Sequence, residues 1–256
     1  MARELEPYQN IERSIIKKFR KEIWRPFIEA VQRYELVNEG DKIAVCISGG
    51  KDSMLMAKLM QELQRHSKVK FELVFLVMDP GYNEINRQKI ESNAELLHIP
   101  ITVFETDVFA VANTSEKNPC YLCARMRRGY LYSKAQELGC NKIALGHHYD
   151  DVIETFLMNL FNEGRIGCFS PKTHLDRKDI TVIRPLVLAP ESQVLSACNR
   201  NGFEIVKSVC PADKTTTRQK TKEFLRDMEH KDKGFKLRMF TALRKSGVDG
   251  WGYPDK

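Results

Sequence analysis

The chain has 256 residues, which suffice for one full domain with extensions but not for a multidomain array. Apolar residues make up 42% of it, which excludes a disordered chain, and the longest apolar run, Leu73 to Met78, is far shorter than the ~20 residues of a membrane span. The first residues, MARELEPYQNIERS, are charged where a secretory signal is apolar. We therefore expect a cytoplasmic protein with no membrane partner.

The formal net charge is +7, and it is concentrated near one end of the chain. The stretch from Lys214 to Lys245 holds eleven basic and four acidic residues, a surplus that equals the net charge of the whole chain. The remainder is therefore neutral. Such a basic block is typical of a surface that binds a polyanion, but the solvated face of a helix has the same composition, and both interpretations stay open.

Hydrophobic periodicity predicts a helix followed by alternating strands and helices. Apolar residues at three- and four-residue spacings predict a helix over 10–37, with a kink at Pro26. Short β-branched runs predict strands at residues 43–47, 71–78, 101–104, 142–145 and 180–183. Further helices are expected at residues 52–66, 84–98, 124–139, 150–163, 190–201, 217–230 and 234–246. The alternation indicates an α/β fold with a doubly wound parallel sheet, because right-handed crossovers connect parallel strands.

The changes in pattern also divide the chain into three parts. We expect an N-terminal helical cap over residues 1–38, the α/β domain over residues 39–207 and a basic C-terminal helical region over residues 208–256. The surplus of positive charge falls in the third part.

The first expected strand is followed directly by Ser48-Gly49-Gly50-Lys51-Asp52-Ser53 and then by an apolar helix. Two glycines allow a tight turn, so that backbone N–H groups and the positive end of the helix dipole converge on an anion. The lysine and the serines add charge and hydroxyl donors. The pattern lacks the GxxxxGK[ST] of Walker A, yet it lies where doubly wound folds bind ligands.

This hexapeptide resembles the signature of the PP-loop ATP pyrophosphatases, enzymes that cleave ATP between the α- and β-phosphates and pass AMP to a substrate oxygen. The resemblance implies that the six residues Ser48, Gly49, Gly50, Lys51, Asp52 and Ser53 hold the pyrophosphate end of ATP with Mg2+, and that Lys51 is catalytic. The same analogy places residues 77–81, with Met78 among them, beside the adenine.

A second motif, Gly146-His147-His148-Tyr149-Asp150-Asp151, follows the fourth expected strand and leads into an amphipathic helix. Asp150 is well placed to be the N-cap of that helix. The motif is similar to one in PP-loop tRNA-modifying enzymes, which implies that Gly146 and His147 contact the nucleotide and that Asp150 or Asp151 serves the reaction. A carboxylate beside a triphosphate is a metal ligand or a base, and the sequence leaves the two roles unassigned.

Seven cysteines, an odd number in a reducing compartment, favour metal ligation or sulfur chemistry over a disulfide framework. Cys120 and Cys123 form a CxxC in an expected loop, and Cys210 follows the last expected strand. A CxxC alone fits zinc, an iron–sulfur cluster, a redox dithiol or coincidence. Three thiolates could hold a 4Fe-4S cluster and leave one iron free to bind sulfide. The remaining cysteines are expected to be ordinary buried or spare thiols: Cys46, Cys140, Cys168 and Cys198.

Several segments together resemble the tRNA 2-thiocytidine synthetases, the TtcA group of tRNA thiolases, over residues 38–245. They are SGGKDS, the CxxC with Arg125, Arg127 and Arg128 behind it, LYSKAQELGCNKIALGHHYDD, IRPL at residues 183–186 and the later single cysteine. The resemblance implies a cluster on Cys120, Cys123 and Cys210, and sulfur insertion at C2 of a cytidine in the tRNA anticodon loop. One departure is Asp213, which stands where members of the group carry another cysteine.

Further expectations concern charge and partners. Arg127 and Arg128 would face the nucleotide and neutralise negative charge on the leaving AMP, unless they are an exposed basic pair. Basic residues of the C-terminal region would contact tRNA phosphates. We expect a homodimer and a sulfur donor that is a cysteine desulfurase or free sulfide. Alternatives are a cysteine persulfide without a cluster, another tRNA base or a small molecule as substrate, and an ATP-binding redox sensor without turnover.

Overall fold

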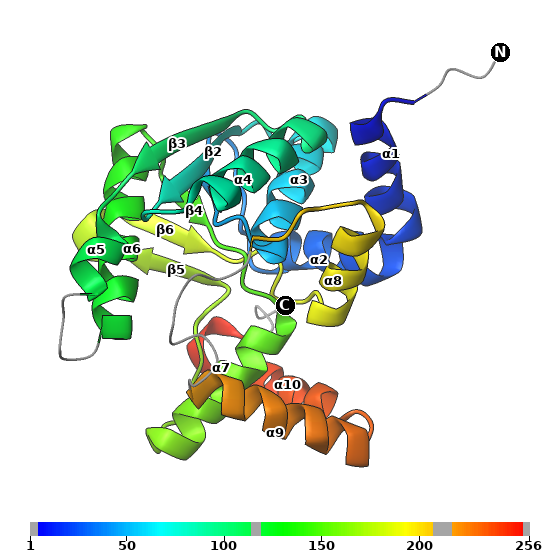
Figure 1. Cartoon of the computed structure of the whole chain (residues 1–256). Helices are drawn as coiled ribbons and strands as arrows, with labels where there is room; N and C mark the ends of the chain where they lie inside the picture. Colours follow the sequence, from blue (N-terminus) through cyan, green and yellow to red (C-terminus); the bar gives the residue numbers. More distant parts are fainter. Residues whose placement is uncertain (1–4, 114–118, 207–216, 253–256) are drawn as a thin grey trace.

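The computed structural model describes residues 5–113, 119–206 and 217–252, and it contains one six-stranded sheet flanked by helices (Figure 1). The strands are β1 (Lys42–Ile47), β2 (Glu72–Asp79), β3 (Ile101–Glu105), β4 (Lys142–Ala144), β5 (Lys172–Leu175) and β6 (Ile180–Ile183). Their order across the sheet is β3-β2-β1-β4-β6-β5. The chain leaves β1 toward β2 on one side and returns to β4 on the other. The carboxyl ends of β1 and β4 therefore flank the switch point at which such folds bind ligands.

The prediction of a parallel sheet is correct for five strands and wrong for the sixth. β5 pairs with β6 in the antiparallel direction, with Thr173 opposite Val182. The strand was missed because its sequence, KTHL, is polar and lies at the edge of the sheet, where one face is exposed to water.

The N-terminal helix is confirmed, but its break is not at Pro26. α1 (Pro7–Arg13) and α2 (Arg25–Arg33) are joined by two π-helical turns that meet at Phe19. Pro26 instead lies in the first turn of α2, where a missing N–H costs no hydrogen bond. Several apolar side chains of this segment are fully buried in the same core as the sheet, namely Ile15, Ile23 and Phe27.

The helices after β1 follow the predicted pattern with two exceptions. They are α3 (Lys51–His66), α4 (Glu84–Leu97), α5 (Val108–Asn113), α6 (Pro119–Glu137), α7 (Tyr149–Asn162), α8 (Glu191–Arg200), α9 (Thr217–Lys231) and α10 (Phe235–Ser246). α5 was not predicted, because six residues are too few to show a helical period. α6 begins five residues before the expected residue 124, so the CxxC lies inside a helix and not in a loop.

Alternating side chains of β1 separate two hydrophobic clusters on the two faces of the sheet. Ile43, Val45 and Ile47 belong to the larger cluster, which includes the N-terminal helices, α3 and α8. Ala44 and Cys46 belong to the smaller cluster beneath α6. Figure 1 shows α9 and α10 beside α7, away from the sheet. Within the described residues, no helix has the length and apolar character needed to cross a bilayer. The expected boundaries at residues 38 and 207 stay predictions.

Candidate functional site

The loop between β1 and α3 is closed by its own serines. Oγ of Ser53 accepts a hydrogen bond from the N–H of Ser48 at 3.1 Å and donates one to the carbonyl oxygen of Gly50 at 3.0 Å. Gly50 is also the N-cap of α3, so the first-turn N–H groups of this helix, which have no intrahelical partner, open at the loop. Backbone donors and the positive end of a helix dipole together make an anion-binding site.

Gly49 allows another part of the chain to approach this loop. Its φ is +76°, and a Cβ here would lie 2.6 Å from Cγ2 of Val206 and 2.7 Å from Cγ1 of Ile90. The N–H of Val206 donates to the carbonyl oxygen of Gly49 at 3.2 Å. The segment that leads toward Cys210 is thus fastened to the loop, and only glycine fits at the point of contact.

A cavity of about 520 Å³ opens beside the loop. The predicted site residues that line it are Ser48, Gly50, Asp52, Ser53, Met78, Arg127, Gly146 and His147. Gly49, Lys51, Asp150 and Asp151 lie outside the lining. Arg128, expected at the site together with Arg127, also lines the cavity, as do residues that sequence reasoning did not assign to the site, namely Tyr132, Phe169 and Arg184. The cavity therefore brings the loop, the end of β2, α6 and the motif after β4 together.

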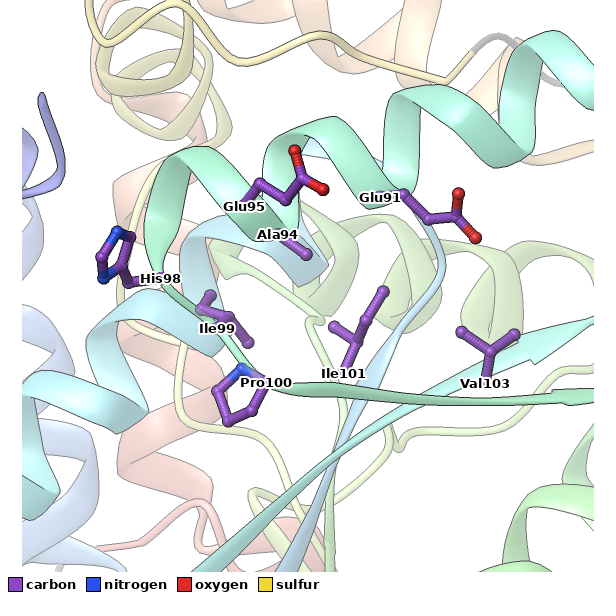
Figure 2. Close-up of a pocket in the computed structure, with 8 residues that line it drawn as sticks. All are labelled: Glu91, Ala94, Glu95, His98, Ile99, Pro100, Ile101 and Val103. Atoms are coloured by element: carbon purple, nitrogen blue, oxygen red, sulfur yellow. The ribbon is translucent and has the colours of Figure 1, made fainter.

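A wider surface depression of about 820 Å³ lies elsewhere, between α4 and the edge strand β3 (Figure 2). Glu91 and Glu95 of α4 and Ile101 and Val103 of β3 line it. Because none of its lining residues belongs to SGGKDS, CxxC or GHHYDD, the chemistry is assigned to the cavity beside the loop.

Gly146 brings the second motif against the first. A Cβ on Gly146 would lie 3.1 Å from the backbone nitrogen of Ser53 and 3.2 Å from its Cα. These are backbone atoms at the start of α3, which cannot move aside as a flexible side chain can. A glycine after β4 is therefore needed for the two motifs to share one cavity.

Arg184 and His147 line the cavity with polar atoms that are not fully used. Nη1 of Arg184 donates to the carbonyl oxygen of Ser170 at 2.6 Å, and the guanidinium lies 5.0 Å from the centre of the Phe169 ring. Nε of Arg184 and Nδ1 of His147 are buried and have no hydrogen-bond partner among the described residues. Burial lowers the pKa of His147 to about 4, so this imidazole is neutral at neutral pH.

The N-cap of α7 is His148, and the expectation that Asp150 caps this helix is wrong. Nδ1 of His148 accepts from the N–H of Asp151 at 3.3 Å, and the N–H of His148 donates to Oδ2 of Asp151 at 2.9 Å. Asp150 lies inside the helix, in its first turn, and its carboxylate has other partners. Oδ2 accepts from the N–H of Glu191 at 2.8 Å, and Oδ1 lies 2.7 Å from Nζ of Lys236.

Three basic side chains of the C-terminal helices are paired with carboxylates around the site. Lys236 of α10 binds Asp150, as described above. Nζ of Lys222 lies 2.6 Å from Oε2 of Glu191. Nη1 of Arg218 lies 3.1 Å from Oδ1 of Asp151 and 3.3 Å from Oε2 of Glu154. These three positive charges therefore connect α9 and α10 to α7 and to the start of α8.

Lys51 does not line the cavity, but it forms ion pairs with two carboxylates beside it. Nζ lies 2.9 Å from Oδ2 of Asp52 and 3.1 Å from Oε1 of Glu191. Burial alone would lower the pKa of Lys51, but the two carboxylates outweigh it and raise the pKa, so the side chain is charged. Glu191 was not predicted as a site residue, because only the fold brings the start of α8 to the loop.

Oδ1 of Asp52 is the remaining oxygen that could hold a cation. It is buried without a hydrogen-bond partner among the described residues, and it lies 3.7 Å from Nε2 of His148. His148 also lies beside Asp151 and within 3.9 Å of Glu191. The described side chains do not include three metal-ligating residues close enough to hold a metal ion by themselves. A cation here would need ligands from a substrate as well.

The predicted cluster ligands are described only in part. Cys123 is half-buried in α6, one residue before Ala124, which lines the cavity. Cys120 belongs to the same helix, but its side chain lies outside the described part of the structure, and Cys210 lies outside it altogether. The expectation for the other four cysteines is confirmed, since Cys46, Cys140, Cys168 and Cys198 are buried. Burial raises the pKa of three of these thiols, those of Cys46, Cys168 and Cys198, to about 12.

The fold, with its glycine loop and nucleotide-sized cavity at the switch point, defines a phosphate-binding α/β protein. A family model described as the PP-loop domain matches residues 12–228, and the chain belongs to this family. Within it, the chain falls in the group that contains the proteins named tRNA-cytidine(32) 2-sulfurtransferase.

Two of these relatives show the extent of the similarity. The protein from Citrifermentans bemidjiense is 37% identical over 220 residues, which cover 84% of this chain and 86% of that protein. The protein from Cellvibrio japonicus is 36% identical over 243 residues, which cover 92% of this chain and 80% of that protein. Among solved structures, the U34-tRNA thiolase NcsA from Methanococcus maripaludis with its [4Fe-4S] cluster has a TM-score of 0.70 at 23% identity. The match covers 87% of this chain and 77% of that one, and it supports the fold.

Proposed function

We propose that the protein is an ATP-dependent tRNA thiolase that replaces the C2 oxygen of a pyrimidine, a cytidine of the anticodon loop, with sulfur. One observation carries the proposal. The phosphate loop and the helix that bears the CxxC line the same cavity, through Ser48 and Ser53 on one side and Arg127 on the other. ATP chemistry and sulfur chemistry can therefore act on one bound base. The names of the relatives support tRNA and cytidine as the substrate.

ATP would bind with its phosphates at the loop. The first-turn N–H groups of α3 and the hydroxyl group of Ser48 suit phosphate oxygens. Among the described lining residues, Arg127, Arg128 and Arg184 give the cavity more positive charge than the one carboxylate, that of Asp52, can neutralise. Met78, at the end of β2, would contact the adenine side, and Gly146 and His147 would face the nucleotide from the end of β4.

Mg2+ would be held by Asp52 and Asp151, together with the phosphates. The unpaired buried oxygen of Asp52 fits a cation ligand. Asp151 and Asp52 lie at the two ring nitrogens of the same imidazole, that of His148, whereas Asp150 binds groups of α8 and α10. We therefore assign the metal or acid–base role to Asp151 and a supporting role to Asp150.

A 4Fe-4S cluster would be held by Cys120, Cys123 and Cys210. Cys120 and Cys123 are three residues apart in α6, a spacing that places two residues on one face of a helix. Val206 is fastened to the loop, and the four residues from there to Cys210 span at most about 14 Å. These constraints are compatible with three thiolates near the cavity. When bound, the cluster would carry the sulfur that enters the base.

The reaction would then proceed in two displacements. The C2 oxygen of the base attacks the α-phosphorus, the bond to the β-phosphate oxygen breaks and pyrophosphate leaves. Sulfur next attacks C2, the C2–O bond breaks and AMP leaves with the oxygen. The guanidinium groups of Arg127 and Arg184 would stabilise the negative charge on the phosphate in both steps. Because His147 is neutral, it does not repel these two guanidinium groups.

The tRNA would contact basic residues that are not used inside the protein. Arg218, Lys222 and Lys236 are paired with carboxylates, whereas other basic side chains of α9 and α10 are exposed, as in Lys220 and Arg226. The target base would have to leave its stack to enter the cavity, and an anticodon loop makes this easier because its bases are unpaired. We further propose that the protein is a cytoplasmic homodimer and that each chain has domain boundaries at residues 38 and 207. The sulfur would come from a cysteine desulfurase or from free sulfide.

Pyrophosphate release tests the proposal. We expect release that requires both ATP and tRNA and that is lost in Lys51→Ala. Release without tRNA would indicate a small-molecule substrate, and binding of ATP without any release would indicate a sensor. An active but colourless protein after anaerobic purification would favour a persulfide over the cluster.

A further inference from the structure

The ammonium of Lys51 is paired with two carboxylates beside the cavity to which its loop belongs. Gly50 and Asp52, its neighbours in sequence, line the cavity, but Lys51 does not. Its Nζ lies 2.9 Å from Oδ2 of Asp52 and 3.1 Å from Oε1 of Glu191, the first residue of α8. The Lys51 side chain is only 17% exposed, so water screens this ion pair weakly.

Glu191 is held in place by partners other than Lys51. Its N–H donates to the carboxylate of Asp150, and its second oxygen lies 2.6 Å from Nζ of Lys222. Burial alone would raise the pKa of Glu191, but the hydrogen bond from Lys222 and the charges of Lys51 and Lys222 lower it to about 2. The carboxylate is therefore fixed and ionised at neutral pH.

We propose that Glu191 is a counter-charge that, together with Asp52, keeps the ammonium of Lys51 paired with protein carboxylates until the phosphates of ATP displace them. This inference rests on the proposed function, in which the cavity binds ATP. Glu191 and the phosphates compete for one ammonium, so the apparent affinity for ATP is reduced by the fraction of protein in which Lys51 is paired with Glu191. Glu191 is thus a positioning residue that acts on the nucleotide through Lys51.

The same competition favours product release. After the α–β bond is cleaved, pyrophosphate must leave a loop that binds it with backbone donors and Lys51. The carboxylate of Glu191 offers the ammonium an alternative partner without any movement of α8, since Lys222 and Asp150 keep Glu191 in position. The ion pair therefore keeps the loop from binding its product too tightly.

The test is calorimetric titration with α,β-methylene-ATP, which cannot be cleaved between the α- and β-phosphates. Glu191→Gln keeps the size of the side chain and its backbone hydrogen bond but removes the charge. We expect it to bind the analogue about five-fold more tightly than the wild type, the scale of a partly exposed ion pair. In a Lys51→Met background the same substitution should change nothing. Glu163→Gln, on an exposed side chain at the end of α7, is the matched control and should bind as the wild type does.

The outcomes separate this inference from the proposed function. Unchanged or weaker binding of the analogue by folded Glu191→Gln overturns the inference. An equal gain in affinity when Glu191→Gln is made in the Lys51→Met background also overturns it, because the gain would then be a general effect of charge. If Glu191→Gln does not fold, Glu191→Asp replaces it in the test, because the shorter side chain draws the carboxylate back from Lys51. We expect Glu191→Asp to bind the analogue more tightly than the wild type, by less than five-fold. No gain in affinity would overturn the inference. A wild-type protein that does not bind the analogue at all would remove the proposed function and this inference with it.

Discussion

The carboxylate of Asp150 lies 2.7 Å from the ammonium of Lys236, although 86 residues separate them in the chain. Asp150 belongs to the motif after β4, and Lys236 belongs to α10. Because the other oxygen of Asp150 accepts from the N–H of Glu191, a single carboxylate joins α7, α8 and α10. A residue that the motif marks as catalytic thus has the contacts of a structural support.

This contact predicts that Asp150 and Asp151 differ when each is changed to Asn. Asp150→Asn leaves Lys236 without its charged partner, and we expect the free energy of unfolding to fall by about 1–3 kcal/mol. Asp151→Asn should lower stability less and pyrophosphate release more. Chemical denaturation and a pyrophosphate assay measure the two effects. The reverse pattern, a stable but inactive Asp150→Asn, would return the catalytic role to Asp150.

Gly49→Ala is expected to weaken binding of ATP at least ten-fold, the scale of about 1.4 kcal/mol. The new Cβ would meet Val206 and Ile90 at less than 3 Å in a left-handed backbone conformation, so the loop must shift. Gly164→Ala is the matched control, because Gly164 also has a positive φ but no atom within 4 Å of its added Cβ. Equal loss of nucleotide binding in both variants would show that backbone strain, and not the contact with Val206, is responsible.

The buried His147 predicts a pH dependence of stability. Its pKa is about 4 in the folded protein and about 6.5 in the unfolded chain. Between these values the unfolded chain binds a proton that the folded protein does not, so this group lowers the free energy of unfolding as the pH falls from 6.5 toward 4. His147→Asn lacks that contribution, and its denaturation curves should depend less on pH over this window. A dependence identical to that of the wild type would contradict a buried, neutral His147.

Cys123→Ala is expected to remove the visible absorbance of anaerobically purified protein. With one of three thiolates missing, a 4Fe-4S cluster loses its support. Cys140→Ala should keep the colour, because Cys140 is buried among the apolar side chains beneath α6. Burial there raises the pKa of its thiol. Absorption spectra and iron analysis of the two variants decide the matter, and a Cys123→Ala protein with full iron content would exclude this thiol as a ligand.

Much of this architecture follows from local patterns in the sequence. Five strands and seven of the later helices were predicted because each has a period of its own, and SGGKDS placed the phosphate loop. The edge strand β5 and the short α5 have no such period. Glu191 and Arg184 were missed for another reason. Glu191 joins the site only because α3 and α8 pack together, whereas Arg184 had a readable signal, since it directly follows a buried strand.

The side-chain roles were harder to predict than the motifs. His148 takes the cap that Asp150 was expected to form, and the carboxylate of Asp150 instead binds Lys236 and the N–H of Glu191. Those partners are 86 and 41 residues away, beyond the reach of any local pattern. The basic C-terminal region likewise looked uniform in sequence, but the fold divides it into charges that bind carboxylates of the site and charges that face solvent.

The central claim is that this chain thiolates a cytidine of tRNA at the expense of ATP. Mass spectrometry of nucleosides from tRNA incubated with the anaerobically reconstituted protein, ATP and sulfide tests it most directly. We expect 2-thiocytidine to form with the wild type and not with Lys51→Ala or without ATP. Unmodified tRNA in the presence of protein that has bound both ATP and its cluster, or thiolation that needs no ATP, would contradict the account.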